Sequence, residues 1–442
     1  MTRYKYEVEG SVLSGAVSIS GAKNAILPIL ACTLINKGVT YIENCPFLSD
    51  IEATINILKM FGCQVIRLDR TIIVDAGSCQ YTAVPSSMTS KCRATLAFLG
   101  SCVARFKEAD IAMPGGCVPG PRPIDMHIES MKAFGLDITQ EESVHVTGTF
   151  HPGTIQLSYP SVGVTENILM MAATCAEETI IKNAAREPEI VNLCQYLEAL
   201  GVNVKGQGSS KITIKGKEEI AQEAHITIIP DRIEAATFLI AAAITGRDVD
   251  ICNCNPGHMT RLLTLLNNMG CEIKTGNDYI NMHKGLLEKE LISPLYIVAK
   301  PYPAFPTDMQ PLIMPLLCLT ATECTPSILT DTVFPCRYVL NSELKKMGAR
   351  VHVIESLARN KVNIRSTVVE GMEFGYSGRF RPAKDLVSHD LRGGAALVIA
   401  SLGAEVGSTS HIYDNGYIQR GYENISEKFS QIGGKVNVKL LK

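Results

Sequence analysis

The stretch "MPGGCVPGPRPIDMH", residues 113–127, could carry reactive chemistry because it places Cys117 between glycines and a Pro-Gly-Pro-Arg-Pro run. No helix or strand favours this composition, so the segment is predicted to be a loop. Glycine permits such a loop to move, and proline limits the shapes that it can adopt. A cation such as Arg122, five residues away, would favour the thiolate form of the cysteine and so its reactivity.

A second group of polar residues lies where apolar segments begin. Helix N-termini carry partial positive charge and spare N–H donors, which suit anionic ligands. Any one of these charged groups alone would be interpreted as a surface ion pair, but their shared position predicts a site for a heavily anionic substrate. The residues concerned are Lys23 with Asn24, Arg93, Asp231 with Arg232 and Glu234, Asp308, Asp390 with Arg392, and Arg420. The sequence contains neither a P-loop nor a dinucleotide-binding glycine motif.

The elements that position these residues follow a repeat. "LSDIEATINILKMFGCQVI" predicts a helix capped at Ser49 or Asp50, ended by Gly62 in a left-handed conformation and followed by a strand. Five similar phrases follow at near-even spacing, and their glycines are Gly135, Gly201, Gly270, Gly348 and Gly433. Six units divide most simply into three per domain. Such a helix-to-strand turn is also common in other α/β proteins, so the phrase alone does not fix the symmetry.

Composition excludes several classes of protein. The chain has 442 residues, 46% of them hydrophobic and 19% charged, with 42 Lys and Arg against 44 Asp and Glu, so a globular protein of two or three domains is expected and a binder of nucleic acid through bulk charge is not. The fifteen cysteines include no C-x-x-C pair, so we expect neither a metal site nor a disulfide framework. No long apolar run and no apolar signal segment is present, and a cytoplasmic protein without a membrane span is expected.

Seven motifs, in order along the chain, resemble those of the UDP-N-acetylglucosamine 1-carboxyvinyltransferases, a family of enolpyruvyl transferases. They are "SGAKNAILPIL", "GGCVPGPRPIDMHI", "PSVGVTENI", "NAAREPEIV", "PDRIEAATFL", "YPAFPTDMQ" and "DLRGGAALV". The resemblance implies a two-domain inside-out α/β barrel built from six repeats, three per domain. One domain would comprise residues 22–229 and the other residues 1–21 plus 230–442, with the active site in the cleft between them. The enolpyruvyl transferases that act on shikimate 3-phosphate share the fold, but they typically carry Lys-Ser in place of Lys23-Asn24 and lack the cysteine loop.

The resemblance also implies a reaction and roles for residues. The family transfers the enolpyruvyl group of phosphoenolpyruvate to the 3′-hydroxyl of UDP-N-acetylglucosamine and releases phosphate, in the first committed step of peptidoglycan synthesis. Cys117 matches the general acid at C3 of phosphoenolpyruvate, which can form a covalent adduct and is the target of fosfomycin; its loop would be a lid. Asp308 matches a proposed base, and Lys23 is the third catalytic residue. No cofactor, metal, nucleic acid, membrane or obligate protein partner is implied.

The substrate-binding residues are assigned by the same resemblance. Those expected around phosphoenolpyruvate are Lys23, Arg122, Arg392 and Arg420. Those expected around UDP-N-acetylglucosamine are Asn24, Arg93, Arg122, Pro123, Ile124, Asp125, His127, Ser161, Val162, Gly163 and Asp308. Arg232 and Arg337 also match family positions, without a clear role. Tyr159, where some members have lysine, and Gln419, where many have aspartate, depart from the pattern. Two alternatives stay open: a paralogue acting on another nucleotide substrate, and a catalytically silent paralogue that binds a UDP-sugar.

Overall fold

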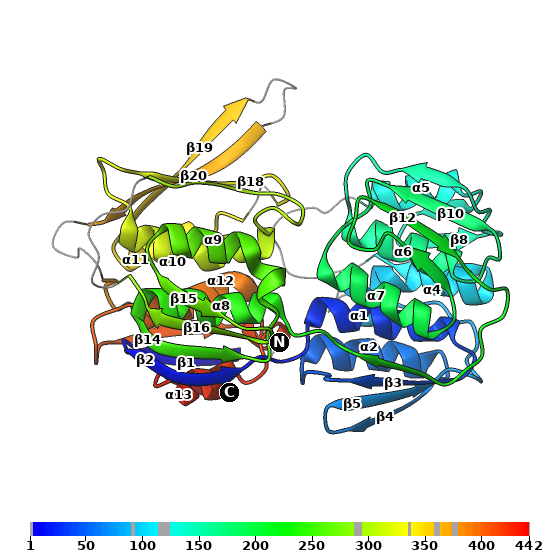
Figure 1. Ribbon diagram of the computed structural model, residues 1–442, viewed down its shortest axis with the longest axis horizontal. Coiled ribbons are helices and arrows are strands. Elements are labelled where there is room, and N and C mark those ends of the chain that lie inside the picture. The colour runs from blue at the N-terminus through cyan, green and yellow to red at the C-terminus, as the bar shows by residue number, and fades with distance from the viewer. Residues whose placement is uncertain are drawn as a thin grey trace. The chain divides into compact units, whose positions relative to one another are not determined.

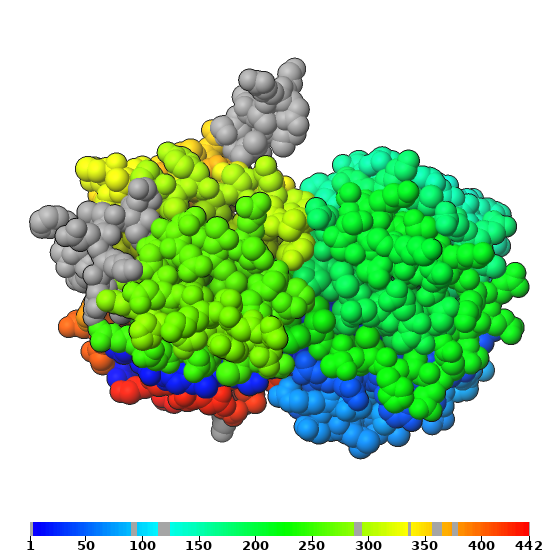
Figure 2. All heavy atoms as spheres, in the orientation of Figure 1, coloured from blue at the N-terminus to red at the C-terminus, as the bar shows by residue number. Residues whose placement is uncertain are grey.

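The computed structural model describes residues 3–89, 93–113, 124–286, 294–334, 337–357, 363–373 and 379–441. The chain forms two compact units. We call the described residues from Gly21 to Ile229 the continuous unit, and those up to Ser20 together with those from Pro230 onward the split unit. Figure 2 shows the consequence in colour: the split unit combines blue, yellow-green and red atoms, whereas the continuous unit runs from blue to green. None of the helices described is long and apolar enough to span a membrane.

The six sheets found among the described residues, three in each unit, share one topology. In one of them β17 (Tyr296–Ala299) pairs in parallel with β18 (Ser327–Asp331), and antiparallel pairing then adds β20 (Asn363–Met372) and β19 (Ala349–Leu357). Four of the other five sheets have one parallel and two antiparallel pairings in the same order, and the fifth has the two antiparallel pairings. The fold is therefore one supersecondary unit used six times, three times per unit of the structure, as the sequence repeat predicts.

The continuous unit contains three of these sheets. Their strands, in sheet order, are β13 (Ala224–Thr227), β3 (Val39–Glu43), β5 (Thr71–Asp75) and β4 (Gln64–Leu68); β6 (Glu108–Ala112), β8 (Ser143–Thr147) and β7 (Asp137–Gln140); and β9 (Thr154–Gln156), β10 (Glu178–Lys182), β12 (Lys211–Lys215) and β11 (Asn203–Lys205). In the second sheet the parallel partner is reduced to a single bridge between Val84 and Ile111.

The split unit is completed by the N-terminal strands. Its remaining sheets are β2 (Leu13–Ser18), β14 (Gly246–Cys252), β16 (Tyr279–Lys284) and β15 (Glu272–Thr275); and β21 (Leu386–Val387), β22 (Thr409–Asp414), β1 (Arg3–Glu9) and β23 (Lys435–Leu441). β1 lies between β22 and β23, in the position that β20 occupies in its own sheet. The two ends of the chain therefore meet in one sheet.

Each unit encloses three buried helices. They are α1 (Lys23–Cys32), α4 (Ala97–Phe106) and α6 (Val162–Ala172) in the continuous unit, and α8 (Arg232–Thr245), α10 (Gln310–Thr320) and α12 (Leu391–Leu402) in the split unit. All residues of α8 are buried, as its apolar sequence predicts. Figure 1 shows α8, α10 and α12 surrounded by the sheets of their unit. Helices inside and sheets outside are the inside-out α/β barrel expected from the sequence.

Outer helices precede the six glycines of the repeat. They are α2 (Ser49–Met60), α5 (Asp125–Ala133), α7 (Pro188–Ala199), α9 (Thr260–Asn268), α11 (Leu340–Lys346) and α13 (Ile425–Gln431). The glycine after each helix has a φ between 79° and 93°, a left-handed conformation that a Cβ atom disfavours. The predicted helix ends are therefore confirmed at all six positions.

Candidate active site

Predicted site residues lie at the starts of all six buried helices. Lys23 and Arg232 are the first residues of α1 and α8, and Ser161 is the N-cap of α6. The others are Arg93, which opens the 3-10 helix η2 (Arg93–Leu96) before α4, Asp308, within η4 (Thr307–Met309) before α10, and Arg392, the second residue of α12. The repeat thus presents a polar group at the same place in each copy.

In the split unit Asp308 lies between two arginines. Arg337 Nη2 donates a hydrogen bond of 2.8 Å to Asp308 Oδ1, and Arg392 Nη2 lies 3.5 Å from Asp308 Oδ2. The side chain of Asp308 is 25% exposed, whereas those of Arg337 and Arg392 are 7% and 2% exposed. The carboxylate is therefore oriented from the protein side and open to a ligand on the other.

Arg392 is held rigidly and has donors to spare. The carboxylate of Asp390 accepts the backbone N–H groups of Arg392 and Gly393, each at 2.9 Å, and so caps α12. The guanidinium lies over the ring of Tyr422, 5.3 Å from its centroid. Burial lowers the pKa of Arg392, but Tyr422 and Asp308 outweigh burial and raise it overall, so the group stays charged. Its Nε and Nη1 atoms find no hydrogen-bond acceptor among the described residues, and an anion would satisfy them.

Arg337 links Asp308 to the loop after β18. Its Nη1 donates to the backbone oxygen of Thr307, whose hydroxyl donates to Asp331 at 2.6 Å. Asp331 also accepts the N–H groups of Val333 and Phe334. Burial raises the pKa of Asp331, although these hydrogen bonds oppose the shift. Arg337 therefore orients the turn that carries Asp308.

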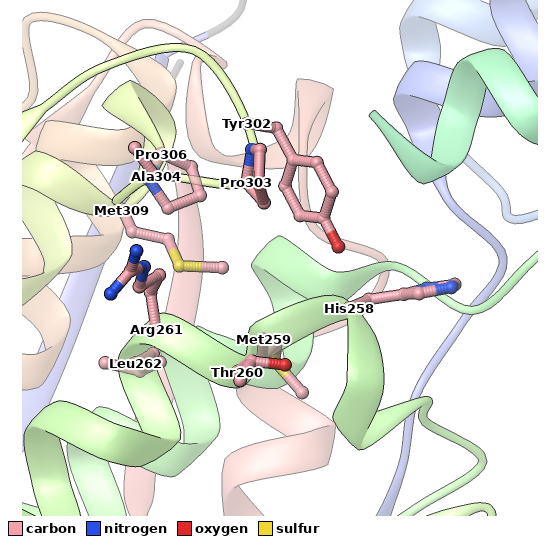
Figure 3. Close-up of a pocket in the computed structure, with 10 residues that line it drawn as sticks. All are labelled: His258, Met259, Thr260, Arg261, Leu262, Tyr302, Pro303, Ala304, Pro306 and Met309. Carbon is pink, nitrogen blue, oxygen red and sulfur yellow. The ribbon is translucent and has the colours of Figure 1, made fainter. Parts of the chain in front are cut away.

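Arg420 and Arg232 lie on segments that border this cluster. Arg420 ends η5 (Ile418–Arg420), and a Cβ atom on the next residue, Gly421, would lie 3.6 Å from Arg392 Nη1. The guanidinium of Arg232 lies 5.3 Å from the ring centroid of Tyr302. A pocket of about 40 Å³ opens beside Tyr302 (Figure 3). Its lining residues are His258, Met259, Thr260, Arg261, Leu262, Tyr302, Pro303, Ala304, Pro306 and Met309.

A buried hydrogen-bond network lies next to the segments that carry these two arginines. It is formed by Ser20, Glu234, Glu423 and Lys428. Lys428 Nζ donates to Glu234 Oε1 at 2.7 Å and to Ser20 Oγ at 2.6 Å. Ser20 in turn donates its N–H to Glu234 at 2.7 Å and its hydroxyl to Glu423 at 2.6 Å. Glu234 lies two residues after Arg232, and Glu423 lies three after Arg420. The network therefore connects α8, α13 and the end of the N-terminal segment.

In the continuous unit Lys23 forms a buried ion pair. Lys23 Nζ lies 2.7 Å from Asp50 Oδ2, and the two side chains are 9% and 5% exposed. The expected capping role of Ser49 or Asp50 is wrong: Leu48 is the N-cap of α2 and no side chain caps the helix, because the Asp50 carboxylate turns to Lys23 instead. Asn24, the next residue, is exposed. The lysine is thus fixed in position, with an exposed polar neighbour.

The start of α6 faces His127. A Cβ atom on Gly163 would lie 3.2 Å from His127 Cε1, so the imidazole packs against the first turn of the helix. Asn167 orients the ring: its Oδ1 accepts the N–H of Gly100 at 2.9 Å, and its Nδ2 donates to Leu96 O at 3.1 Å and contacts His127 Nδ1 at 2.9 Å. With this amide as the donor, Nδ1 is the acceptor and Nε2 carries the hydrogen. The structure thus brings Ser161, Val162 and Gly163 together with His127.

The remaining predicted residues are described in part. Asp125 begins α5 and is exposed, and Ile124 before it is buried. Cys117, Arg122 and Pro123 lie outside the described residues, and for Arg93 the backbone alone is described. Sequence reasoning missed Asp50, Asn167, Tyr302 and the Glu234–Lys428 pair. Asn167, the one amide in a helix that is apolar apart from it and its neighbours Thr165 and Glu166, carried a usable signal; the others did not.

The sequence of the chain is similar to those of known carboxyvinyltransferases. Residues 8–429 match the model of the EPSP synthase (3-phosphoshikimate 1-carboxyvinyltransferase) family. The chain is 40% identical over 440 residues to UDP-N-acetylglucosamine 1-carboxyvinyltransferase 2 of Caldanaerobacter subterraneus subsp. tengcongensis, covering 98% of this chain and 99% of that protein. It is 36% identical to the UDP-N-acetylglucosamine 1-carboxyvinyltransferase of Finegoldia magna, with 96% of each chain covered.

Solved structures show the same fold. The enolpyruvyl transferase NikO from Streptomyces tendae superposes with a TM-score of 0.83 at 22% identity, over 100% of both chains. An EPSP synthase from Acinetobacter baumannii gives a TM-score of 0.68 at 18% identity, over 99% of this chain and 100% of that one. The curated relatives, matched over nearly their full length, identify the chain as a member of the UDP-N-acetylglucosamine 1-carboxyvinyltransferase family of enolpyruvyl transferases.

Proposed function

We propose that this protein transfers the enolpyruvyl group of phosphoenolpyruvate to the 3′-hydroxyl of UDP-N-acetylglucosamine and releases phosphate. The observation that carries the proposal is the Asp308 carboxylate, oriented by Arg337 and Arg392 and open on one side. A hydroxyl bound at that side can pass its proton to the carboxylate, and the unused donors of Arg392 suit the carboxylate or phosphate of phosphoenolpyruvate. The relatives named above carry this substrate in their names.

In this proposal two side chains transfer protons, and four cationic side chains balance the charge of the substrate. Asp308 accepts the proton of the sugar hydroxyl as its oxygen attacks C2 of phosphoenolpyruvate, and Cys117 donates a proton to C3. Lys23, Arg122, Arg392 and Arg420 balance the charge of the phosphate and carboxylate while C2 is tetrahedral. Loss of a proton from C3 and departure of phosphate then regenerate the enol ether, now on the sugar oxygen.

The nucleotide part of the acceptor is assigned to the start of α6 and its surroundings. The first N–H groups of that helix are donors for a diphosphate. Asp125, with Ile124 and Pro123, is proposed to contact the uracil, Asn24 the amino sugar and Arg93 the nucleotide. Because one set of groups lies in each unit, we propose that UDP-N-acetylglucosamine binds first and that both units then act on the same pair of substrates.

The test is phosphate release from phosphoenolpyruvate with each acceptor in turn, followed by mass analysis of the product. We expect almost no release with phosphoenolpyruvate alone, and release together with an enolpyruvyl UDP-sugar when UDP-N-acetylglucosamine is added. Release with shikimate 3-phosphate instead would contradict the substrate assignment. Release with another nucleotide, or with none, would favour the paralogue or the catalytically silent binder. The cytoplasmic location and the role in peptidoglycan synthesis stay predictions.

Variants test the two proton-transfer residues. Asp308→Asn should lower turnover by roughly 100–10,000-fold, the range for loss of a general base. The matched control is Asp385→Asn, an exposed carboxylate at 75% exposure, which should leave turnover unchanged. Cys117→Ala should lose most turnover, whereas Cys117→Asp should retain much of it at mildly acid pH because a carboxylic acid can still donate a proton. Equal rates in the alanine variant and the wild type would remove Cys117 from the mechanism.

A further inference from the structure

Two cysteines of the continuous unit that have no role in the site above come close to each other in the fold. Cys63 follows Gly62 at the end of α2, and Cys79 lies in the turn after β5. Their backbones are adjacent: Gln80 N–H donates to Phe61 O at 2.8 Å, and a Cβ atom on Gly62 would lie 3.9 Å from Cys79 Cα. The two thiols are near enough to shift each other's pKa in opposite directions, and the residues are 5% and 9% exposed. The fold therefore already brings the two cysteines close together in the reduced protein.

A cation completes the arrangement. Arg105, in the last turn of α4, donates from Nη2 to the backbone oxygens of Ala76 at 3.1 Å and Gly77 at 3.3 Å, just before Cys79. These bonds hold its guanidinium near Cys79, where its charge helps to lower the pKa of the thiol. An arginine next to a thiol stabilises the thiolate, which is the nucleophilic form.

The protonation of the pair is asymmetric. The interaction with Cys63, opposed by burial and aided by Arg105, lowers the pKa of Cys79 to about 7. The same interaction, together with burial, raises the pKa of Cys63. One thiol thus keeps its proton while the other takes thiolate character. By contrast, burial raises the pKa of Cys102 and Cys318, as is usual for cysteines that only fill a core.

We propose that Cys63 and Cys79 are a redox-active pair that forms a reversible disulfide when the protein meets a hydroperoxide. The Cys79 thiolate attacks one peroxide oxygen, the O–O bond breaks, and the departing oxygen leaves as water or an alcohol after taking up a proton. The resulting sulfenic acid is then attacked by the sulfur of Cys63, whose proton leaves with the hydroxyl as water. Two thiols are oxidised by two electrons in total, and the peroxide is reduced.

The bond would join the end of α2 to the end of the hairpin formed by β4 and β5. The segment between Cys63 and Cys79 already brings the two cysteines together in the native structure, so oxidation needs little rearrangement. In the unfolded chain the disulfide would close this segment into a loop and restrict its conformations. We therefore expect the oxidised protein to unfold at a higher temperature than the reduced protein, with a shift of several degrees that dithiothreitol reverses.

The experiment treats the full chain with hydrogen peroxide, alkylates the remaining thiols and identifies linked peptides by mass. The expected result is a peptide pair joined through Cys63 and Cys79, with both of these thiols protected from alkylation until dithiothreitol is added. Cys63→Ser should leave a sulfenic acid on Cys79 that dimedone traps, whereas Cys79→Ser should leave Cys63 reduced. The control is Cys324→Ser, which removes an exposed thiol and should not alter the linked peptide.

Two results would overturn the proposal. One is that Cys63 and Cys79 both stay alkylatable at a peroxide concentration that oxidises the exposed Cys324. The other is that Cys79 becomes over-oxidised, or joins a different cysteine, without linking to Cys63. Both readouts come from the wild-type protein, so they do not depend on whether a serine variant folds.

Discussion

Replacing Lys428 by methionine should break the buried network behind Arg232 and Arg420. Methionine fills a similar volume, but it leaves the Glu234 carboxylate, which is 3% exposed, without its lysine partner and with the N–H of Ser20 as a hydrogen-bond donor. Removing one partner of a buried ion pair costs about 3–5 kcal/mol because the other charge stays buried and unpaired. We therefore expect Lys428→Met to lower the free energy of unfolding by about 3–5 kcal/mol at neutral pH.

The stability that Lys428→Met loses should increase as pH rises. Burial raises the pKa of Glu234 above its ordinary value of 4.5, although Lys428 opposes the shift. Without Lys428 the pKa rises further, so the native variant binds a proton that the unfolded chain has released. Over that range the native state holds more protons, and stability falls as pH rises. The deficit of the variant relative to the wild type should thus be smallest near pH 4 and should grow toward neutrality.

The assay is urea unfolding of the wild type and the variants at several pH values. The matched control is Lys435→Met: Lys435 Nζ lies 2.5 Å from Glu9 Oε1, but the side chains are 63% and 29% exposed, so about 0–1 kcal/mol is expected. Adding Glu234→Gln to Lys428→Met should recover part of the loss, since no charge is then left buried. A loss in Lys428→Met no larger than in Lys435→Met would refute the reasoning.

Three further predictions concern other residues of the two units. Burial, followed by the charges of neighbouring glutamates, raises the pKa of Glu166 from 4.5 to about 8, so the native state holds a proton that the unfolded chain loses across this range and stability falls as pH rises through it. Glu166→Gln should match the wild type at pH 5 and exceed it by about 2–4 kcal/mol at pH 9 in denaturant unfolding; equal stability at both would contradict this. Gly62→Ala should cost about 1–2 kcal/mol from its φ of 88° alone, since the nearest atom lies 3.9 Å away. Gly100→Ala should cost more, because its Cβ would lie 2.7 Å from a backbone oxygen of α6; the reverse order of the two midpoints would be evidence against this packing argument. Asp50→Asn should lower turnover by roughly 10–100-fold through misplacement of Lys23, and an unchanged phosphate-release rate would exclude that role.

The repeat could be predicted from sequence because its signals are local. A glycine after an apolar helical face reports a left-handed helix end within a few residues, and all six such glycines have that conformation. The buried helices were predictable for a similar reason, since a segment that is apolar on every face has no side to turn to water. The polar residues at their starts interrupt this pattern and thus marked the candidate site.

Pairings between distant elements could not be predicted in this way. The position of Asp50 in the first turn of a helix favours a cap, and its use by Lys23 depends on how α1 packs against α2. Arg337 likewise gained a role only when the structure placed it beside Asp308. The contact between Cys63 and Cys79 arises because a hairpin returns the chain to the end of α2, which the spacing of cysteines does not reveal.

The position of β1 has a consequence for synthesis on the ribosome. The continuous unit has all its strands once β13 emerges, so it can fold while the rest of the chain is being made. β1, in contrast, pairs with β22 and β23 at the opposite end of the chain. At about 5–20 residues per second, this first strand waits roughly 20–90 s with its backbone donors and acceptors unpaired. An unpaired strand is a template for aggregation, so β1 is a segment that a nascent-chain chaperone would need to cover for this whole interval.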